Sequence, residues 1–74
     1  MIVEAFDSNR RALGERSYYE HGEEAARRAA LTVLLEIPEA ARSSFIEARS
    51  AEGLLYHFPV AVLKGTKKQR KAKS

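Results

Sequence analysis

The sequence contains no cysteine and no tryptophan, and it has only two prolines and four glycines among its 74 residues. Without cysteine, neither a disulfide nor a zinc site built on thiolates can form. The missing thiols also fit a reducing compartment. A chain of this length supports one domain with a thin core, and 45% of its residues are hydrophobic.

Long apolar runs are missing as well. The longest, such as Val33–Leu35 and Val60–Leu63, fall far short of the roughly 20 residues that cross a bilayer. The N-terminal stretch Met1–Phe6 is interrupted by Glu4, and it has no basic leader and no small-residue cleavage site. We therefore expect a cytoplasmic protein that has no membrane partner.

Lysine is absent from residues 1–63, whose seven arginines and ten acidic residues give a net charge of −3. Residues 64–74 contain no acid and six basic residues, which are Lys64, Lys67, Lys68, Arg70, Lys71 and Lys73. We expect a compact domain over residues 1–64 and a disordered basic tail over residues 65–74, because so polar a segment cannot form a core. The six basic residues are the candidate site for non-specific binding to nucleic-acid phosphates.

The clearest periodic pattern predicts a helix from Glu23 to Glu36. Small and aliphatic residues recur at helical spacing on one stripe, which comprises Ala26, Ala29, Ala30, Val33 and Ile37, with Leu34 beside it. Gly22 is a permissive N-cap. Pro38 ends the helix, because the residue before a proline avoids the helical region.

Residues 38–53 are consistent with two structures. In the first, Pro38 opens a second helix. In the second, residues 43–50 form a strand, Ala51-Glu52-Gly53 form a turn with a glycine bulge, and residues 54–63 form the return strand. We favour this hairpin, because its second arm is rich in aromatic and β-branched residues.

Residues 54–63 alternate in the manner of a strand that is apolar on both faces. One face would carry Leu54, Tyr56, Phe58, Val60 and Val62, and the other Leu55, His57, Ala61 and Leu63. Pro59 cannot donate to a ladder, which places this strand at an edge of the sheet or at a bulge. One helix cannot cover both apolar faces, so we expect a second copy of the chain or a protein partner to cover the other.

Two further strands are expected before the helix. Ile2–Phe6 fits a strand that ends at the turn-forming residues Asp7-Ser8-Asn9. Residues 11–19 fit a second strand with Gly14 as a bulge, or a short helix, and we favour the strand. The predicted fold is α+β: a small four-stranded antiparallel sheet (ββαββ along the chain) with one Ala-rich helix packed on a face. A small all-helical domain is the alternative.

No motif for catalysis, cofactor binding or metal binding is present. His21 and His57 have no fixed spacing to a carboxylate cluster, and we interpret both as structural residues. Glu23 and Glu24 point about 100° apart on a helix, so we interpret them as first-turn charges that pair with the arginines four residues later. We expect a protein that is not an enzyme and takes no cofactor, metal or small-molecule substrate.

Two hypotheses of function remain. The one we favour is a protein-binding module, of the kind that phages and other mobile elements encode to inhibit or adapt a larger machine. Machines that handle nucleic acid are among the candidate targets. The other is a nucleic-acid accessory protein that uses the basic tail. The acidic body favours the first, because a fold that reads nucleic acid carries basic residues on the fold itself. We predict a homodimer or a docked protein partner, with an interface formed by Leu55, His57, Leu63, Tyr18 and Tyr19.

Overall fold

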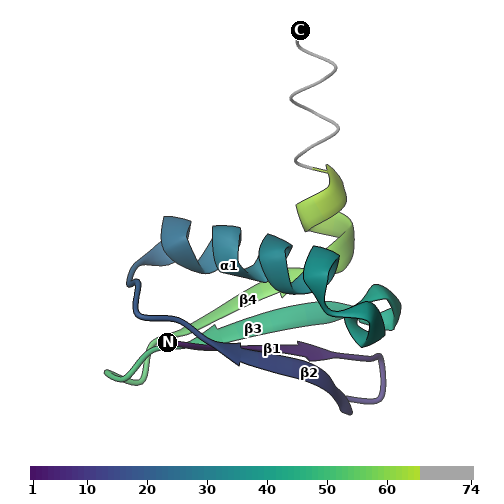
Figure 1. Ribbon diagram of the computed structural model, residues 1–74, viewed down its shortest axis with the longest axis horizontal. Helices are drawn as coiled ribbons and strands as arrows, with labels where there is room; N and C mark the ends of the chain where they lie inside the picture. The colour runs from purple at the N-terminus through teal and green to yellow at the C-terminus, as the bar shows by residue number, and fades with distance from the viewer. Residues whose placement is uncertain (66–74) are drawn as a thin grey trace, which may run out of the picture.

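The chain forms one four-stranded antiparallel sheet that is crossed on one face by a helix (Figure 1). The computed structural model describes residues 1–65. Its elements are β1 (Ile2–Phe6), β2 (Ala12–Ser17), α1 (Glu23–Glu36), the short 3-10 helix η1 (Pro38–Arg42), β3 (Phe45–Arg49) and β4 (Leu55–Pro59), followed by helical residues 60–65. The strands lie in the order β2-β1-β3-β4. The predicted α+β fold is confirmed, and the all-helical alternative is not supported.

Residues 66–74, which hold most of the predicted basic tail, lie outside the described residues. The division into a domain and a tail therefore stays a prediction. Within residues 1–65, no helix combines the length and the hydropathy that crossing a bilayer requires.

Helix α1 covers the sheet with a stripe of small side chains. Its buried residues are Ala25, Ala26, Ala29, Ala30, Val33 and Leu34. Alanine lets the helix approach the sheet closely, because no long side chain separates the two layers. The helix begins after Gly22, whose φ of 97° favours glycine, and Ile37 is extended because Pro38 follows it. The predicted bounds of this helix are confirmed.

The ion pairs expected between Glu23 or Glu24 and the arginines four residues later are absent from the ion pairs of residues 1–65. All four side chains are exposed. An exposed pair gains at most about 1 kcal/mol, which the entropy of two long side chains can cancel. The two glutamates still lie in the first turn of α1, where the helix dipole favours negative charge.

The core lies between α1 and alternate residues of the central strands. Val3 and Ala5 of β1 and Ile46 and Ala48 of β3 are all fully buried. The register pairs Val3 with Ala48 and Ala5 with Ile46, so a large side chain lies beside a small one in each pair. This alternation fills the layer beneath α1 evenly. Phe58 of β4 extends the same core toward the sheet edge.

The β3–β4 hairpin closes with the predicted glycine bulge. The Gly53 N–H donates to the Ser50 carbonyl at 3.1 Å, and the Ser50 N–H donates to the Leu54 carbonyl at 2.9 Å. Gly53 has a φ of 89°, which favours glycine at this position. The hairpin interpretation is therefore confirmed, with η1 as a short helical segment before it.

The β1–β2 hairpin has the same hydrogen-bond pattern without a glycine. The Arg10 N–H donates to the Asp7 carbonyl, and the Asp7 N–H donates to the Arg11 carbonyl, each at 3.0 Å. Arg10 takes the place that Gly53 has in the other turn, with a φ of 64°. The Asp7 carboxylate accepts from the N–H groups of Asn9 and Arg11 at 2.8 and 2.9 Å. The predicted turn after β1 is confirmed.

The bulge predicted at Gly14 lies one residue earlier. Gly14 pairs regularly with Ala5, and the pairing shifts at Leu13. Gly14 is needed for packing instead, because a Cβ atom there would lie 2.8 Å from Cγ2 of Ile37. The sequence pattern identified the glycine but not the close approach of a distant residue that requires it.

The strand predicted over residues 54–63 is too long. β4 ends at Pro59, and residues 60–65 are helical. In a helix Val60 and Leu63 lie on the same side, and both are buried, with Leu63 only 2% exposed. The prediction that Leu63 belongs to a protein interface is therefore wrong. Alternation over so short an apolar run does not separate a strand from a helical turn.

Pro59 lies in an edge strand, as predicted. The Val60 N–H donates to the Ser44 carbonyl at 2.9 Å. Because ladder hydrogen bonds involve alternate residues, Phe58 and Tyr56 also direct their backbone groups toward β3, while Pro59 directs its nitrogen outward. The N–H that proline lacks therefore costs the sheet no hydrogen bond.

Replacing Ala30 tests the packing of α1 on the sheet. We expect Ala30→Glu to unfold the protein, because it buries an unpaired carboxylate at a fully buried position. Such a change costs about 3 kcal/mol or more, which is comparable with the whole stability of a domain this small. Thermal melting followed by circular dichroism measures the effect. Arg27→Glu, on the exposed side of the same helix, is the control. A native melting curve for Ala30→Glu would contradict the assigned helix face.

Candidate binding face of the sheet

The sheet face opposite α1 is open. Figure 1 shows α1 and the helical residues 60–65 on one side of the sheet and, among the described residues, no element on the other. The strand register arranges the side chains of this open face in three rows across the strands. These are an apolar row (Ala12, Phe6, Phe45, Pro59), a carboxylate row (Glu15, Glu4, Glu47, with His57 at its end) and a third row (Ser17, Ile2, Arg49, Leu55).

The carboxylate row places three like charges side by side. Glu4 pairs with Glu15 of β2 on one side and with Glu47 of β3 on the other. Like charges directly opposite one another destabilise an antiparallel pair. Glu47 has its Oε2 atom 3.4 Å from Nδ1 of His57, whereas neither Glu4 nor Glu15 has an ion-pair partner within residues 1–65. The fold therefore leaves the negative charges of Glu4 and Glu15 without an ion-pair partner within residues 1–65.

Aromatic rings form a continuous surface beside the carboxylate row. The rings of Phe6 and Phe45 are stacked, with centroids 5.3 Å apart and planes 18° apart. The His57 ring stacks on the other side of Phe45 at 4.9 Å. His57 thus contacts both Phe45 of the apolar row and Glu47 of the carboxylate row.

Arg10 reaches this face from the β1–β2 turn. Its guanidinium carbon lies 5.3 Å from the centroid of the Phe45 ring, within the range of a cation–π contact. The left-handed backbone that places it there costs a residue other than glycine about 1–2 kcal/mol. Backbone outliers and unfavourable pairs concentrate at functional sites. The strained Arg10 and the carboxylate row both belong to the open face, which makes this face the candidate site.

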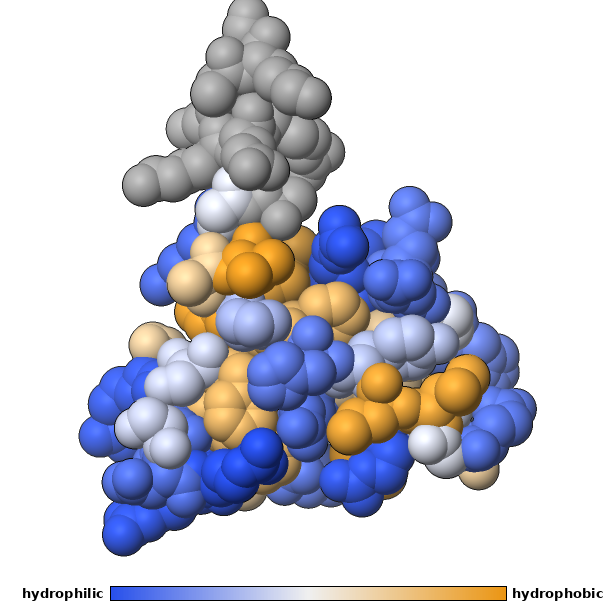
Figure 2. All heavy atoms as spheres, turned by 180° about the vertical axis from the view of Figure 1, so that it is seen from behind, coloured by the Kyte–Doolittle hydropathy of each residue, from blue (hydrophilic) through white to orange (hydrophobic). Residues whose placement is uncertain are grey.

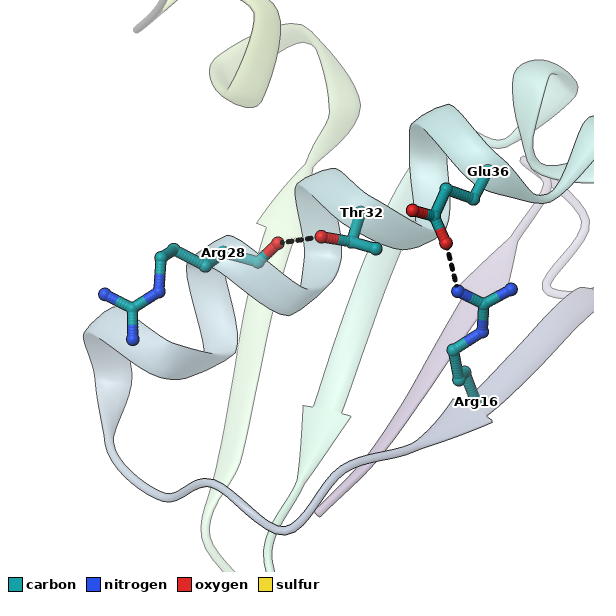
Figure 3. Close-up of polar contacts among 4 residues, drawn as sticks. All are labelled: Arg16, Arg28, Thr32 and Glu36. Atoms are coloured by element: carbon teal, nitrogen blue, oxygen red, sulfur yellow. Dashed lines mark hydrogen bonds and ion pairs between the residues drawn. The ribbon is translucent and has the colours of Figure 1, made fainter.

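A separate polar contact connects the sheet to α1. Arg16 of β2 donates to Glu36 in the last turn of α1, and the Thr32 hydroxyl donates to the Arg28 carbonyl at 3.0 Å (Figure 3). The hydrogen bond to Glu36 raises the pKa of the Arg16 guanidinium above its ordinary value. The contact joins β2 to the end of α1 and lies on the side of the sheet away from the open face.

The predicted interface residues lie in three different places. Leu55, which is 55% exposed, and His57 lie on the open face. Tyr18 packs against the core on the helix side, and its buried hydroxyl makes no hydrogen bond within residues 1–65. Tyr19 is 99% exposed in the connection before α1. With Leu63 in the core, only Leu55 and His57 share a surface.

Of the predicted nucleic-acid set, Lys64 is the member within the described residues, and it is exposed. Lys67, Lys68, Arg70, Lys71 and Lys73 lie outside them. Lys64 lies beside an apolar groove of about 240 Å³ that Leu31, Leu34, Leu35 and Ala41 also line. Ligand pockets commonly reach about 300–1,000 Å³ and carry several convergent polar groups. The groove has one charged lining residue, so we assign no small-molecule site to it.

Exposed apolar side chains are distributed in patches. Figure 2, which views the molecule from behind, shows hydrophobic residues in separate groups with hydrophilic residues between them. The large apolar side chains with the most exposure, besides Tyr19, are Leu35, Leu54, Leu55, Val62 and Ile2. Two of these, Leu55 and Ile2, belong to the third row of the open face.

Sequence reasoning missed four central residues of the open face: Glu4, Phe6, Phe45 and Glu47. Alternation within Ile2–Phe6 was a usable signal, because residues two apart in a strand share a face. The pairing of Glu4 with Glu47 depends on strand order and register, which no local pattern contains. Within residues 1–65, no three histidine, aspartate or glutamate side chains are arranged to hold a metal ion.

Comparisons with known proteins add no constraint. No family model, no curated protein and no solved structure matches this chain. The case for a function therefore depends on the geometry of the open face.

Neutralising the centre of the carboxylate row tests its electrostatic cost. We expect Glu4→Gln to raise the free energy of unfolding by about 0.2–1 kcal/mol, because it removes two like-charge contacts and keeps the side-chain shape. Urea unfolding at low ionic strength measures this, and the gain should shrink near about 1 M salt. Glu52→Gln, in the exposed β3–β4 turn, is the control. A loss of stability in Glu4→Gln would mean that the carboxylate makes a favourable contact.

The aromatic stack can be tested with a double-mutant cycle. We expect Phe6→Ala and Phe45→Ala to couple by about 0.5–1.5 kcal/mol in denaturant unfolding, as stacked rings do. Phe6→Ala and Leu55→Ala, at opposite ends of the face, should add within about 0.5 kcal/mol. Additivity within the same limit for the two phenylalanines would show that the rings do not interact.

Proposed function

We propose that this chain is a non-enzymatic protein-binding module that docks through the open face of its sheet. One observation carries the proposal: a face with stacked aromatic rings and exposed aliphatic side chains is crossed by a carboxylate row that the fold leaves uncompensated. Apolar surface of this kind gains from being covered by a partner. A charged row across its middle restricts which partner can cover it.

The carboxylate row favours protein over nucleic acid as the ligand of this face. Two phenylalanines on neighbouring central strands resemble, in isolation, a platform on which bases stack. Here Glu4 and Glu47 lie on the same face as the two rings, two residues from Phe6 along β1 and two residues from Phe45 along β3. Phosphates that accompany a stacked base would approach these carboxylates and be repelled. The body of the chain, residues 1–63, also has a net charge of −3.

Self-association is one form that this proposal can take. Two copies placed open face to open face would oppose their carboxylate rows, which disfavours that arrangement. A homodimer would instead use the third row, where Ile2 of the central strand β1 and Leu55 of the edge strand β4 are exposed. A larger machine that the chain inhibits or adapts is the other form, and it can use the whole face.

The alternative function is nucleic-acid binding through the basic tail. It predicts that binding depends on the basic residues of the tail and not on the open face. Tail binding should be non-specific, with a Kd of about 10⁻⁴–10⁻⁶ M at physiological salt. We therefore expect fluorescence polarisation with labelled single-stranded DNA and RNA to detect weak, salt-sensitive binding by the full chain. Substituting Lys67, Lys68, Arg70, Lys71 and Lys73 by glutamine should abolish it.

The matched control for this titration is Phe6→Ala/Phe45→Ala with the tail intact. We expect its affinity to stay within about twofold of the unchanged chain, because the sheet face does not bind the oligonucleotide. The contrary result is binding that persists at physiological salt without the tail charges and disappears with the two phenylalanines. That result would show that the open face binds nucleic acid, and it would overturn the proposed function.

A further inference from the structure

We infer that the partner of the open face is a basic segment of another protein, in which a lysine or arginine lies between two apolar side chains. This inference rests on the proposed function and adds the chemistry of the ligand to it. The basic side chain would lie on Glu4 and Glu47, and the apolar ones on the apolar row and on the third row.

The spacing of the rows determines the pattern of the segment. Successive rows are two residues apart along each strand, which corresponds to about 7 Å. An extended segment that lies along the strands presents alternate side chains at the same interval. Its side chains can therefore contact the three rows as an apolar, a basic and an apolar residue, each separated by one residue that points away.

The face already holds one cation from its own chain. The Arg10 guanidinium lies over the Phe45 ring, so the aromatic surface accommodates a guanidinium. The Phe45 ring also stacks with His57, which in turn contacts Glu47. A cation placed on the carboxylate row would thus have both carboxylate oxygens and the edge of the aromatic stack as neighbours.

Charge complementarity decides between this occupant and a purely apolar one. An apolar segment would remove water from Glu4 and Glu15, which have no ion-pair partner within residues 1–65. Desolvating an unpaired carboxylate is costly, and a basic side chain offsets that cost. Arg49 in the third row lies next to Glu47 along β3 but forms no ion pair with it within residues 1–65. An external cation therefore meets no competing ion pair of residues 1–65 at Glu4 or Glu15, and at Glu47, whose side chain is 14% exposed, it meets only His57.

The experiment begins with phage display, in which random peptides of about 12 residues are selected for binding to the immobilised full chain. At about 3.4 Å per residue, an extended peptide of this length is long enough to reach all three rows. The selected peptides are then titrated against two variants with the same change in net charge. Glu4→Lys/Glu47→Lys reverses the charge of the row, and Glu20→Lys/Glu52→Lys changes exposed positions in two connections, outside the three rows. Circular dichroism establishes that both variants are folded. Phe6→Ala/Phe45→Ala reports separately whether a peptide uses the open face.

We expect the selected peptides to be enriched in lysine or arginine with apolar residues two positions away on each side. Their affinity should fall about tenfold or more in Glu4→Lys/Glu47→Lys and stay unchanged in Glu20→Lys/Glu52→Lys. Peptides that depend on the two phenylalanines but carry no basic residue would overturn this inference and leave the proposed function standing. Peptides that are insensitive to every change on the open face, or a selection without enrichment, would overturn both.

Discussion

Close contact between the alanine stripe of α1 and the inner face of the sheet is the interaction on which the other features depend. Ala26 and Ala30 are fully buried against Val3, Ile46 and their neighbours. A single helix of 14 residues can cover one face of a four-stranded sheet and no more. The described chain supplies no second layer, so the opposite face stays open, and whatever lies on it is available to a ligand.

The open face contains two features that make the fold less stable than it needs to be. The carboxylate row sets like charges against one another across three strands. The β1–β2 turn places Arg10 in a backbone conformation that the equivalent turn assigns to Gly53. Unfavourable features of this kind are expected on a binding surface, because binding requires charge and shape that selection for stability alone would remove.

The elements with strong local signals were predictable from the sequence. The bounds of α1 follow from Gly22, Pro38 and the periodic alanines, and Pro59 indicated an edge strand. Predictions failed where two distant segments meet. The need for Gly14 comes from Ile37, and the burial of Leu63 comes from a helical turn that an alternating apolar run did not reveal.

At the candidate site, even less could be predicted from local sequence patterns. His57 and Leu55 were identified because their own strand is apolar on both faces. Phe45 and Glu47 were not, because their significance depends on Phe6 and Glu4, about 40 residues earlier in the chain and adjacent only through strand order. A binding face on a sheet is a property of register, and register is determined by tertiary packing.

Whether this face is uncovered in the free protein can be tested directly by NMR on the dilute full chain. The measurement is the relaxation that a soluble paramagnetic probe causes at each methyl group. We expect the methyl groups of Ile2 and Leu55 to relax fast, as those of Leu35 do, which is 73% exposed on the helix side. The methyl groups of Val3 and Ile46 should be protected. Protection of Ile2 and Leu55 at a level similar to the core would show that the chain or a second copy covers the face, which would contradict the account.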